Sequence, residues 1–516
     1  MFSIGATVSE AMKYTVGVQA KPPIDGSNRR ASDIISHAVK NNGIALVQGP
    51  PGTGKTTTYM NVIENTIDRI TPQEVYLYIA PTNELVNDMF RKVCFYYANK
   101  FGPDFKKYLE NEVRVYGSQF DFSGYEQLNK QLSRGVKIVI STNYQRIFYK
   151  DEKIAYHMLI DEASKSPLHV PFQILVNSIL EEKRLEGSIS IVGDPMQAIS
   201  LSEYYSGLSR RLLMMSYFIR GKLDVPSYDN SDDYELLLRA RKEIKDGTYG
   251  FLDTTFRMPG PSHEGISQGY YNGELNAHVN FSKNNGRVNF DLNMLKDLKN
   301  ENQIFSQVGQ TIEDALTTDI GMMIVLDDDK HPYESVKGVL YDERRGEYGL
   351  VAAIILAIIT RSKTTVVTTY VDQHFQMRMK YYSKYRALAS RYGKFIDGLL
   401  EFKTTQSMLG AQSANTVLIL GKESSGSSGE RTIYFQEPEL LNVQLSRHFG
   451  FLVVVGNLKR LYHSASTANI TYGTKLYKPL SVTSEAILNQ AGYEKRNRNF
   501  VKSTSGNESE SMEIEN

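Results

Sequence analysis

Short runs of apolar residues, separated by longer stretches of mixed polarity, recur along most of this chain. A first group occupies residues 43–48, 75–80, 137–140, 158–160 and 188–192, and a second occupies 365–368, 416–420 and 451–455. Nearly continuous apolar strands that alternate with helices are typical of parallel sheets covered on both faces. The pattern therefore predicts an α/β fold with two groups of parallel strands.

The stretch between the two groups, about 220–350, is more polar than either group. We therefore place a domain boundary near residue 250, with one domain over 1–250 and a second over 251–495. The segment 496–516 is expected to be a disordered acidic tail. Its last part, 503–516, carries four Glu, several Ser and no Lys or Arg, which cannot supply a packed core.

The composition is that of an ordinary globular protein, with 41% hydrophobic and 23% charged residues. A chain of 516 residues is too long for one core, so at least two domains are expected. The 59 basic and 58 acidic residues give a net charge of +1. Any nucleic-acid binding must therefore come from local patches, backbone amides or stacking. The single cysteine, Cys94, excludes an internal disulfide framework and a Cys-rich zinc module.

The sequence contains no pattern that predicts export or membrane insertion. Residues 1–20 lack a basic start followed by an apolar core, which a secretory signal would need. The longest apolar run, 350–359, has ten residues, so it is too short to span a bilayer and predicts a buried helix. We expect a soluble intracellular protein, with cytoplasm and nucleus left open and a viral or plasmid origin compatible with so compact a chain.

A glycine-rich loop directly follows the apolar run 43–48. It fits G-x-x-x-x-G-K-[ST], the phosphate loop of nucleoside triphosphatases, and residues 57–63 can begin a helix after it. Backbone N–H groups and the helix N-terminus bind phosphate oxygens, while Lys55 reaches the β- and γ-phosphates and Thr56 holds Mg²⁺. The residues expected to contact ATP here are Gly49, Pro50, Pro51, Gly52, Thr53, Gly54, Lys55, Thr56 and Thr57.

Two adjacent carboxylates follow the apolar run 158–160. Asp161 is expected to bind Mg²⁺ through water, and Glu162 to orient and deprotonate the water that attacks the γ-phosphate. A charged strand end is the ordinary alternative, but these strands belong to the same group as the phosphate loop. Further along, Gln197 could sense the γ-phosphate, whereas Asp194 could simply cap a turn.

The order of these and later segments resembles the superfamily 1 helicases, especially the branch of the nonsense-mediated-decay RNA helicase and its DNA-unwinding relatives. The similar segments are 80–86 (motif Ia), 139–143 (Ic), 161–164 (II), 193–197 (III), a following helix at 207–213, 255–259, 271–275, 366–373 (IV), 404–410 (V), and 441–447 with 455–457 (VI). The resemblance covers about 28–457. Its most specific parts are the phosphate loop, the segment around Arg257 and motif VI.

This resemblance implies two RecA-like domains with ATP and Mg²⁺ in the cleft between them. Arginine can neutralise the charge that develops on a transferred phosphoryl group, so Arg257 and Arg447 would complete the site when the domains close. The implied catalytic set is Lys55, Asp161, Glu162, Gln197, Arg257 and Arg447, with Thr56 and Asp161 at the metal. The nucleic-acid contacts implied are Pro81, Thr82, Asn83, Ser141, Thr142 and Thr404, whose small polar groups can hold phosphates without reading bases.

The chain departs from the family pattern in motif V. Leu409 and Gln412 stand where the family usually has Gln and Glu, so Gln412 can still contact the nucleotide but brings no charge. The family's adenine-reading Gln has no clear match, although Asn28 and Ser32 stand nearby. Nucleotide selectivity could therefore be loose.

Other departures lie around motif VI and between the motifs. Ser446 and His448 flank Arg447, where the family commonly has Thr and Ala. We expect a small insertion over the nucleic-acid channel at about 91–135 and a second, unassigned insertion at about 281–350.

Residues 380–395 combine five basic and five aromatic residues without an acid. Single-stranded nucleic acids bind such combinations, because phosphates meet Lys and Arg while bases stack on Tyr and Phe. We nevertheless favour an amphipathic helix here, with its Tyr residues packed and its Lys residues solvated.

These observations predict an ATP hydrolase that moves along single-stranded RNA or DNA as a monomer and separates duplexes. The direction 5′ to 3′ follows from the family resemblance alone. Two alternatives stay open, a translocase that strips proteins without unwinding and a nucleotide-gated clamp that turns over slowly. A small-molecule kinase would not explain the second strand group with Arg447. The sequence leaves RNA and DNA undecided, because it shows no contact to a 2′-OH.

Overall fold

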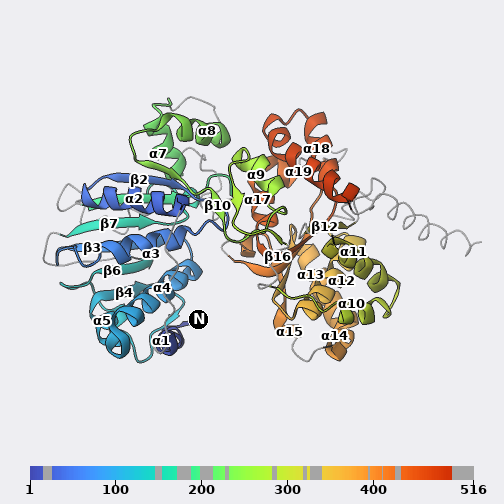
Figure 1. Ribbon diagram of the computed structural model, residues 1–516, viewed down its shortest axis with the longest axis horizontal. Helices are drawn as coiled ribbons and strands as arrows, with labels where there is room; N and C mark the ends of the chain where they lie inside the picture. The colour runs from blue at the N-terminus through green and yellow to red at the C-terminus, as the bar shows by residue number, and fades with distance from the viewer. Residues whose placement is uncertain are drawn as a thin grey trace, which may run out of the picture. The chain divides into compact units, whose positions relative to one another are not determined.

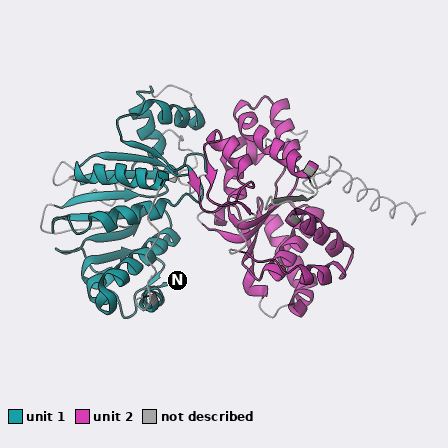
Figure 2. Cartoon of the chain, in the orientation of Figure 1, with its two compact units in different colours: residues 1–253 teal, residues 254–516 magenta. Residues whose placement is uncertain are grey.

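The computed structural model describes residues 1–14, 26–143, 145, 154–170, 187–197, 213–226, 232–281, 288–317, 322–325, 340–392, 396–408, 411–424 and 432–490. The chain divides into two compact units, residues 1–253 and 254–516 (Figure 2). Three predicted features lie outside the described residues. They are the acidic tail, residues 207–212 of the helix after motif III, and Leu409 with Gly410 of motif V.

Unit 1 is built on a parallel sheet (Figure 1). In spatial order its strands are β4 (Val113–Tyr116), β6 (Ile138–Thr142), β3 (Glu74–Ala80), β7 (Ala155–Ile160), β8 (Gly187–Gly193), β2 (Ile44–Gln48) and β9 (Tyr249–Phe251). The central strands are buried almost throughout, as their continuous apolar sequence predicts. All neighbouring strands pair in parallel, so their carboxyl ends share one edge of the sheet.

Helices cover the unit 1 sheet. Figure 1 shows α2 (Gly26–Lys40), α3 (Lys55–Thr66) and α4 (Asn83–Phe101) in a row over one face. Outside this row, α1 (Ile4–Tyr14) packs against α4, and α7 (Met214–Lys222) contacts α8 (Asp233–Glu243). The helical row and the sheet bury one apolar cluster that includes Tyr59, Tyr78 and Phe90. That cluster forms the apolar core of unit 1.

Unit 2 contains a second parallel sheet. Its strand order is β12 (Met322–Val325), β16 (His448–Val455), β15 (Ser413–Ile419), β13 (Thr364–Thr368) and β14 (Leu400–Thr404). All its neighbouring strands are parallel. The predicted α/β fold class with two parallel-sheet units is therefore confirmed.

The most apolar segment of the chain forms the central helix of unit 2. Helix α12 (Glu343–Thr360) is buried on all sides along its second half, which confirms the predicted buried helix at 350–359. Its neighbours are α10 (Leu292–Lys299), α11 (Gln303–Thr317) and α13 (Val371–Lys380). The remaining helices are the π-helix η8 (Tyr381–Tyr385), α14 (Arg386–Tyr392), α15 (Ile396–Leu399), α9 (Glu264–Tyr271), α16 (Ile433–Gln436), α17 (Glu439–Leu445), α18 (Leu458–Thr467) and α19 (Thr471–Gln490).

The two stretches predicted as insertions contribute to the sheets. Within 91–135, the second half of α4 is followed by α5 (Phe105–Glu112) and by β4, which pairs with β6. The same stretch contains β5 (Phe120–Asp121), which pairs with β1 (Phe2–Ser3). Within 281–350, α10 and α11 bury their apolar faces against α12, and β12 pairs with β16. Across the described ranges, every helix is too short or too polar to cross a membrane.

Candidate functional site

The glycine-rich loop connects β2 to α3 in unit 1, as its sequence predicts. Gly52 has φ 74° and Gly54 has φ 81°, a left-handed region that glycine adopts without steric cost. A Cβ on Gly49 would lie 2.5 Å from Cγ of Lys55, so a larger residue there would displace the lysine side chain. The loop geometry therefore requires the glycines of the motif.

Asn28 braces this loop from α2. Its buried amide Nδ2 donates to the backbone oxygen of Thr53 at 2.8 Å and to the Thr58 hydroxyl at 3.1 Å. The Thr53 hydroxyl in turn donates to Pro50 O at 2.8 Å. Sequence reasoning considered Asn28 only as a contact to adenine and missed this bracing role. Ser32 accepts a hydrogen bond from Asn61 of α3 at 2.7 Å and thus ties the two helices together.

Three charged residues of the predicted catalytic set, Lys55, Asp161 and Glu162, meet at the carboxyl ends of β2 and β7. Lys55 Nζ lies 3.3 Å from Glu162 Oε1 and donates to Gly49 O at 3.1 Å. The Thr56 hydroxyl donates to Asp161 Oδ2 at 3.3 Å. Lys55, Thr56, Asp161 and Glu162, which are far apart in the sequence, thus form one polar cluster beside the loop.

Asp161 is almost completely buried, and its burial raises the pKa of its carboxyl group. The neighbouring Glu162 carboxylate raises this pKa further, while Lys55 and a hydrogen bond from Tyr78 oppose the rise. The Tyr78 hydroxyl donates to Asp161 Oδ2 at 2.8 Å, and the backbone N–H of Glu162 donates to Oδ1 at 2.8 Å. Sequence reasoning missed Tyr78, because a tyrosine in an apolar strand gives no chemical signal.

The backbone at Glu162 is unusual. This residue has φ 50° and ψ 37°, a left-handed conformation that costs a non-glycine residue of order 1–3 kcal/mol. The turn directs the chain out of β7 immediately after Asp161. Strained residues of this kind are concentrated at functional sites, which agrees with a role for this carboxylate.

The donors in this cluster suit a magnesium ion. A threonine hydroxyl and a buried carboxylate are hard oxygen donors, which Mg²⁺ prefers together with water and phosphate oxygens. In the part of the chain that the structure describes, no group of three or more His, Cys, Asp or Glu side chains forms a metal cage. A cation held by Thr56 and Asp161 would therefore need water and phosphate ligands to complete its shell.

Gln197 is joined to this cluster through Asp194. The Gln197 amide donates to Asp194 Oδ2 at 3.0 Å, and the Gln48 amide donates to Oδ1 at 3.2 Å. The backbone N–H of Asp194 donates to the Ser164 hydroxyl at 3.1 Å, two residues after Glu162. Asp194 therefore links Gln197 both to the end of β2 and to the acidic turn, in addition to capping its own turn at Met196.

The two predicted arginines lie in unit 2 and are held close to motif VI. Arg257 donates through Nε to Gln412 Oε1 at 3.3 Å and through Nη1 to Ser446 O at 3.2 Å. Arg447 is 2% exposed, and its Nε donates to Val443 O at 2.8 Å. The structure thus brings Arg257, Gln412 and the end of α17 together within unit 2.

His448 follows Arg447 and is fully buried. Its Nε2 lies 2.8 Å from the Ser262 hydroxyl, which donates to Pro259 O at 2.7 Å. Burial lowers the pKa of His448 to about 3, so the ring is neutral at physiological pH. His448 therefore acts as an uncharged link between motif VI and the segment that follows Arg257.

The residues predicted to contact nucleic acid lie at strand ends. Pro81, Thr82 and Asn83 follow β3, and Thr82 caps α4 by accepting from Leu85 N at 3.4 Å. Ser141 and Thr142 end β6, which is paired with β3, but their side chains are buried. In unit 2, Thr404 ends β14 and its hydroxyl donates to Ser407 Oγ at 3.2 Å.

The basic and aromatic segment 380–395 packs as the favoured interpretation predicts. Tyr381 and Tyr385 are each 2% exposed, whereas Tyr382 is 49% exposed. The cations have acidic partners on neighbouring elements: Lys384 pairs with Glu347, Arg386 with Asp397 and Arg391 with Glu301. The amphipathic interpretation is confirmed for 380–392, while 393–395 lie outside the described residues.

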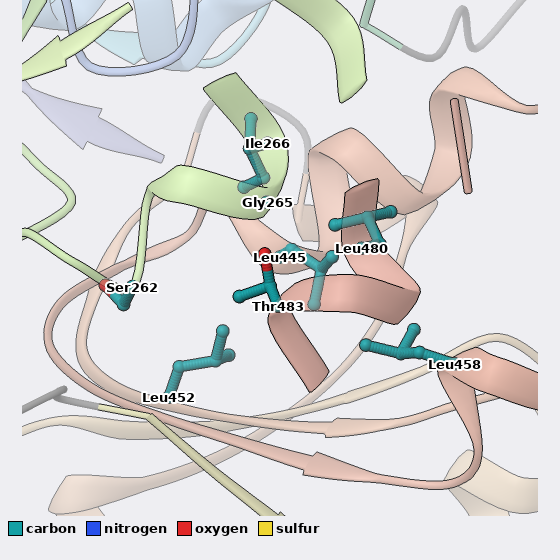
Figure 3. A pocket seen from close by; sticks show the side chains of 8 residues that line it. All are labelled: Ser262, Gly265, Ile266, Leu445, Leu452, Leu458, Leu480 and Thr483. Atoms are coloured by element: carbon teal, nitrogen blue, oxygen red, sulfur yellow. The ribbon is translucent and has the colours of Figure 1, made fainter. Parts of the chain in front are cut away.

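A small apolar cavity of about 10 Å³ lies inside unit 2 (Figure 3). Its lining residues are Ser262, Gly265, Ile266, Leu445, Leu452, Leu458, Leu480 and Thr483. A cavity of this size has room for about one water molecule, and most of the side chains that line it are apolar. None of the predicted site residues lines it.

Comparison with known proteins agrees with the geometry around the phosphate loop. Residues 26–164 match the sequence model of a family described as an AAA domain. The matched region runs from α2 to Ser164, so it contains the loop and both carboxylates. Over 271 residues the chain is 25% identical to the Saccharomyces cerevisiae protein named "Putative ATP-dependent RNA helicase ECM32". This family match and this relative support the resemblance to the superfamily 1 helicases.

The match to ECM32 covers 49% of this chain and 23% of the yeast protein, so the chain spans about a quarter of that relative's length. A second relative, "Replicase polyprotein 1ab" of Breda virus 1, is 26% identical over 154 residues, which are 30% of this chain and 2% of the polyprotein.

Solved helicase structures are also similar to the chain. An arterivirus nonstructural protein 10 helicase in complex with DNA has a TM-score of 0.35 and 12% identity, covering 83% of this chain and 62% of that one. Saccharomyces cerevisiae Dbp5 bound to RNA and ADP BeF3 has a TM-score of 0.39 and 11% identity, covering 94% and 96%.

Proposed function

We propose that this chain hydrolyses ATP and uses the energy to move along single-stranded nucleic acid and separate duplexes, in the 5′ to 3′ direction. The observation that carries the proposal is the cluster of Lys55, Thr56, Asp161 and Glu162 beside a glycine loop at a helix N-terminus. The resemblance to superfamily 1 helicases supports nucleic acid as the track.

In the proposed reaction, backbone N–H groups of the loop and the N-terminus of α3 bind the phosphates of ATP. Lys55, which pairs with Glu162 in this structure, would turn to the β- and γ-phosphates when nucleotide binds. Thr56 and Asp161 would hold Mg²⁺, which supplies charge neutralisation at the phosphates. Glu162 would orient the attacking water and accept its proton.

Other residues are proposed to respond to the γ-phosphate. Gln197 would sense its presence and relay its loss through Asp194 to the acidic turn. Arg257 and Arg447 would neutralise the charge that develops during transfer, with Gln412 orienting Arg257. These three residues belong to unit 2, so hydrolysis would couple to motion between the units.

The experiment that tests the proposal is steady-state ATP hydrolysis with no polymer, with single-stranded RNA and with single-stranded DNA. We expect strong stimulation by one polymer and its loss in Glu162→Gln, which keeps the side chain's size but removes the base. Strand displacement on substrates with a 5′ or a 3′ overhang then determines direction. Stimulation without displacement would favour the protein-stripping translocase. Turnover near background with either polymer would contradict the motor and favour the nucleotide-gated clamp.

A further inference from the structure

Gln444, in the middle of motif VI, is the centre of a buried hydrogen-bond network in unit 2. Its side chain is fully buried. The amide Nε2 donates to the Thr369 hydroxyl at 3.0 Å and to the Thr405 hydroxyl at 2.7 Å. Its Oε1 accepts from the Tyr434 hydroxyl at 3.2 Å. The whole amide is therefore used within the protein.

The partners of Gln444 come from the carboxyl ends of neighbouring strands. Thr369 directly follows β13, and Thr405 directly follows β14, which pairs with β13 in parallel register. The Tyr434 hydroxyl also bonds Thr369 at 3.0 Å and accepts from Gly421 N at 2.9 Å, just beyond β15. Gln444, together with Tyr434, thus ties the ends of three strands.

This network adjoins a residue that is proposed to contact the nucleic-acid backbone. Thr404 is the last residue of β14 and is bonded to Thr405 through the chain. Thr405 is anchored to β13 by its backbone N–H and its hydroxyl, both to Thr368 O, at 3.0 Å and 3.3 Å. A phosphate bound at Thr404 would therefore move Thr405, and with it the hydroxyl that Gln444 holds.

At its other end, Gln444 belongs to the helix that positions both arginines. It lies in α17 directly after Val443, whose carbonyl accepts from Arg447 Nε at 2.8 Å. Two residues further on, the carbonyl of Ser446 accepts from Arg257 Nη1 at 3.2 Å. A displacement of Gln444 would move the end of α17 with it. The carbonyl groups of Val443 and Ser446, which orient the two guanidinium groups, would then change position.

From this geometry we infer that Gln444 is a positioning residue that couples nucleic-acid contact at the ends of β13 and β14 to the placement of Arg257 and Arg447. The inference rests on the proposed function. Buried, fully satisfied polar networks are rigid, because breaking one bond leaves a buried donor or acceptor without a partner. Such a network has few arrangements, so it can transmit a discrete displacement from the strand ends to the helix.

The test compares Gln444→Leu with Asn442→Leu. Asn442 is the matched control because it is equally buried in α17, but its amide donates to the Tyr271 hydroxyl at 2.7 Å instead of to the strand ends. Both variants are first checked for cooperative thermal unfolding. Thr405→Val breaks the same network from the strand side without altering α17, and it keeps the test valid if Gln444→Leu does not fold.

Two quantities are measured, the ratio of polymer-stimulated to basal ATP turnover and the affinity for the polymer with and without a non-hydrolysable ATP analogue. For Gln444→Leu and Thr405→Val we expect two quantities to fall about tenfold: the stimulation of ATP turnover by the polymer, and the change in polymer affinity that the ATP analogue causes. Both should fall, because coupling between two binding sites is reciprocal. A double variant should lose no more than either single variant. Asn442→Leu should keep both couplings.

Failure of the inference is distinguishable from failure of the proposed function. A wild-type protein that neither RNA nor DNA stimulates overturns the proposed function and the coupling together. A stimulated wild type with equally stimulated Gln444→Leu and Thr405→Val overturns the coupling alone. Equal losses in Asn442→Leu would also overturn it, since they would show general damage to α17.

Discussion

At the carboxyl ends of β2 and β7 in unit 1 the side chains are charged, whereas at the ends of β13 and β14 in unit 2 they are neutral. Lys55, Asp161 and Glu162 lie within one polar cluster beside the phosphate loop. At the ends of β13 and β14, hydroxyl groups bond to the amide of Gln444. The ends of parallel strands thus carry a cluster of charged groups in one unit and a neutral hydrogen-bond network in the other.

The energetic consequences differ between these two edges. At the unit 1 edge, burial and then the neighbouring Glu162 carboxylate raise the pKa of Asp161. In the proposed reaction a cation and phosphates would compensate these buried charges. The neutral network in unit 2 requires no ligand to be satisfied. Its arginines are held by carbonyl oxygens of Val443 and Ser446, so their positions depend on the backbone of α17.

The largest expected effect comes from removing a unit 2 charge. Arg447→Ala should lower polymer-stimulated ATP turnover by about 10³–10⁵-fold, the usual contribution of an arginine finger. ATP affinity, measured by equilibrium binding, should change much less, because the phosphate loop lies in unit 1. Arg447→Lys keeps a positive charge but not the planar fork, and should recover only part of the loss. Turnover within tenfold of the wild type in Arg447→Ala would contradict an arginine finger at this position.

The next effect concerns the stability of unit 2 against acid. Burial lowers the pKa of His448 to about 3, whereas an unfolded histidine titrates near 6.5. Between these values the unfolded chain binds the additional proton, so stability is lost as pH falls from about 6.5 towards 3. At pH 5 the loss should be about 2 kcal/mol.

The measurement is denaturant unfolding of the wild type and of His448→Ala between pH 5 and pH 8. The variant should lose this part of the pH dependence. It is less stable at pH 8, because a cavity remains and the Ser262 hydroxyl keeps only its bond to Pro259 O. Identical pH profiles for the two proteins would contradict the assignment of a neutral, buried His448.

Arg447 and Gln444 differ in how far the sequence alone could single them out. Arg447 could be found from the order of segments around it, and the phosphate loop from its glycines and its flanking strand and helix. The role of Gln444 could not, because its partners Thr369 and Thr405 are brought to it by strand pairing between distant segments. Sequence periodicity predicts that strands exist but does not give their order or the side chains at their shared edge.

The same limit applies to unit 1. The continuous apolar run of β3 predicts a buried strand, but it does not show that the hydroxyl of Tyr78 reaches Asp161 directly after β7. From the sequence, Asn28 and Ser32 could only be noted near the place where the family has its adenine-reading Gln. Only the fold shows that both amide hydrogens of Asn28 are directed at the loop backbone and at α3.

A moderate effect is therefore expected for Asn28→Ala. Removing the amide frees Thr53 O and the Thr58 hydroxyl, and we expect this to weaken ATP binding about tenfold, or about 1.4 kcal/mol, by loosening the loop. Ser32→Ala is the matched control on the same helix, because its hydroxyl bonds Asn61 on α3. Equilibrium binding of a non-hydrolysable ATP analogue distinguishes the two. Equal losses in both variants would show that α2 packing, rather than the brace, sets the affinity.

The smallest expected effect separates charge from packing at the unit 1 edge. Tyr78→Phe removes one hydrogen bond to Asp161 and nothing from the core, so the pKa of Asp161 should rise further and Mg²⁺ should bind about threefold to tenfold more weakly. The matched control is Tyr59→Phe. The hydroxyl of Tyr59 donates to the backbone oxygens of Ile160 and Ser190 and not to Asp161. Magnesium titrations of ATP hydrolysis at neutral pH measure both variants. If Tyr59→Phe weakened Mg²⁺ binding as much as Tyr78→Phe does, Mg²⁺ affinity would depend on the packing of the sheet and not on the hydrogen bond from Tyr78 to Asp161.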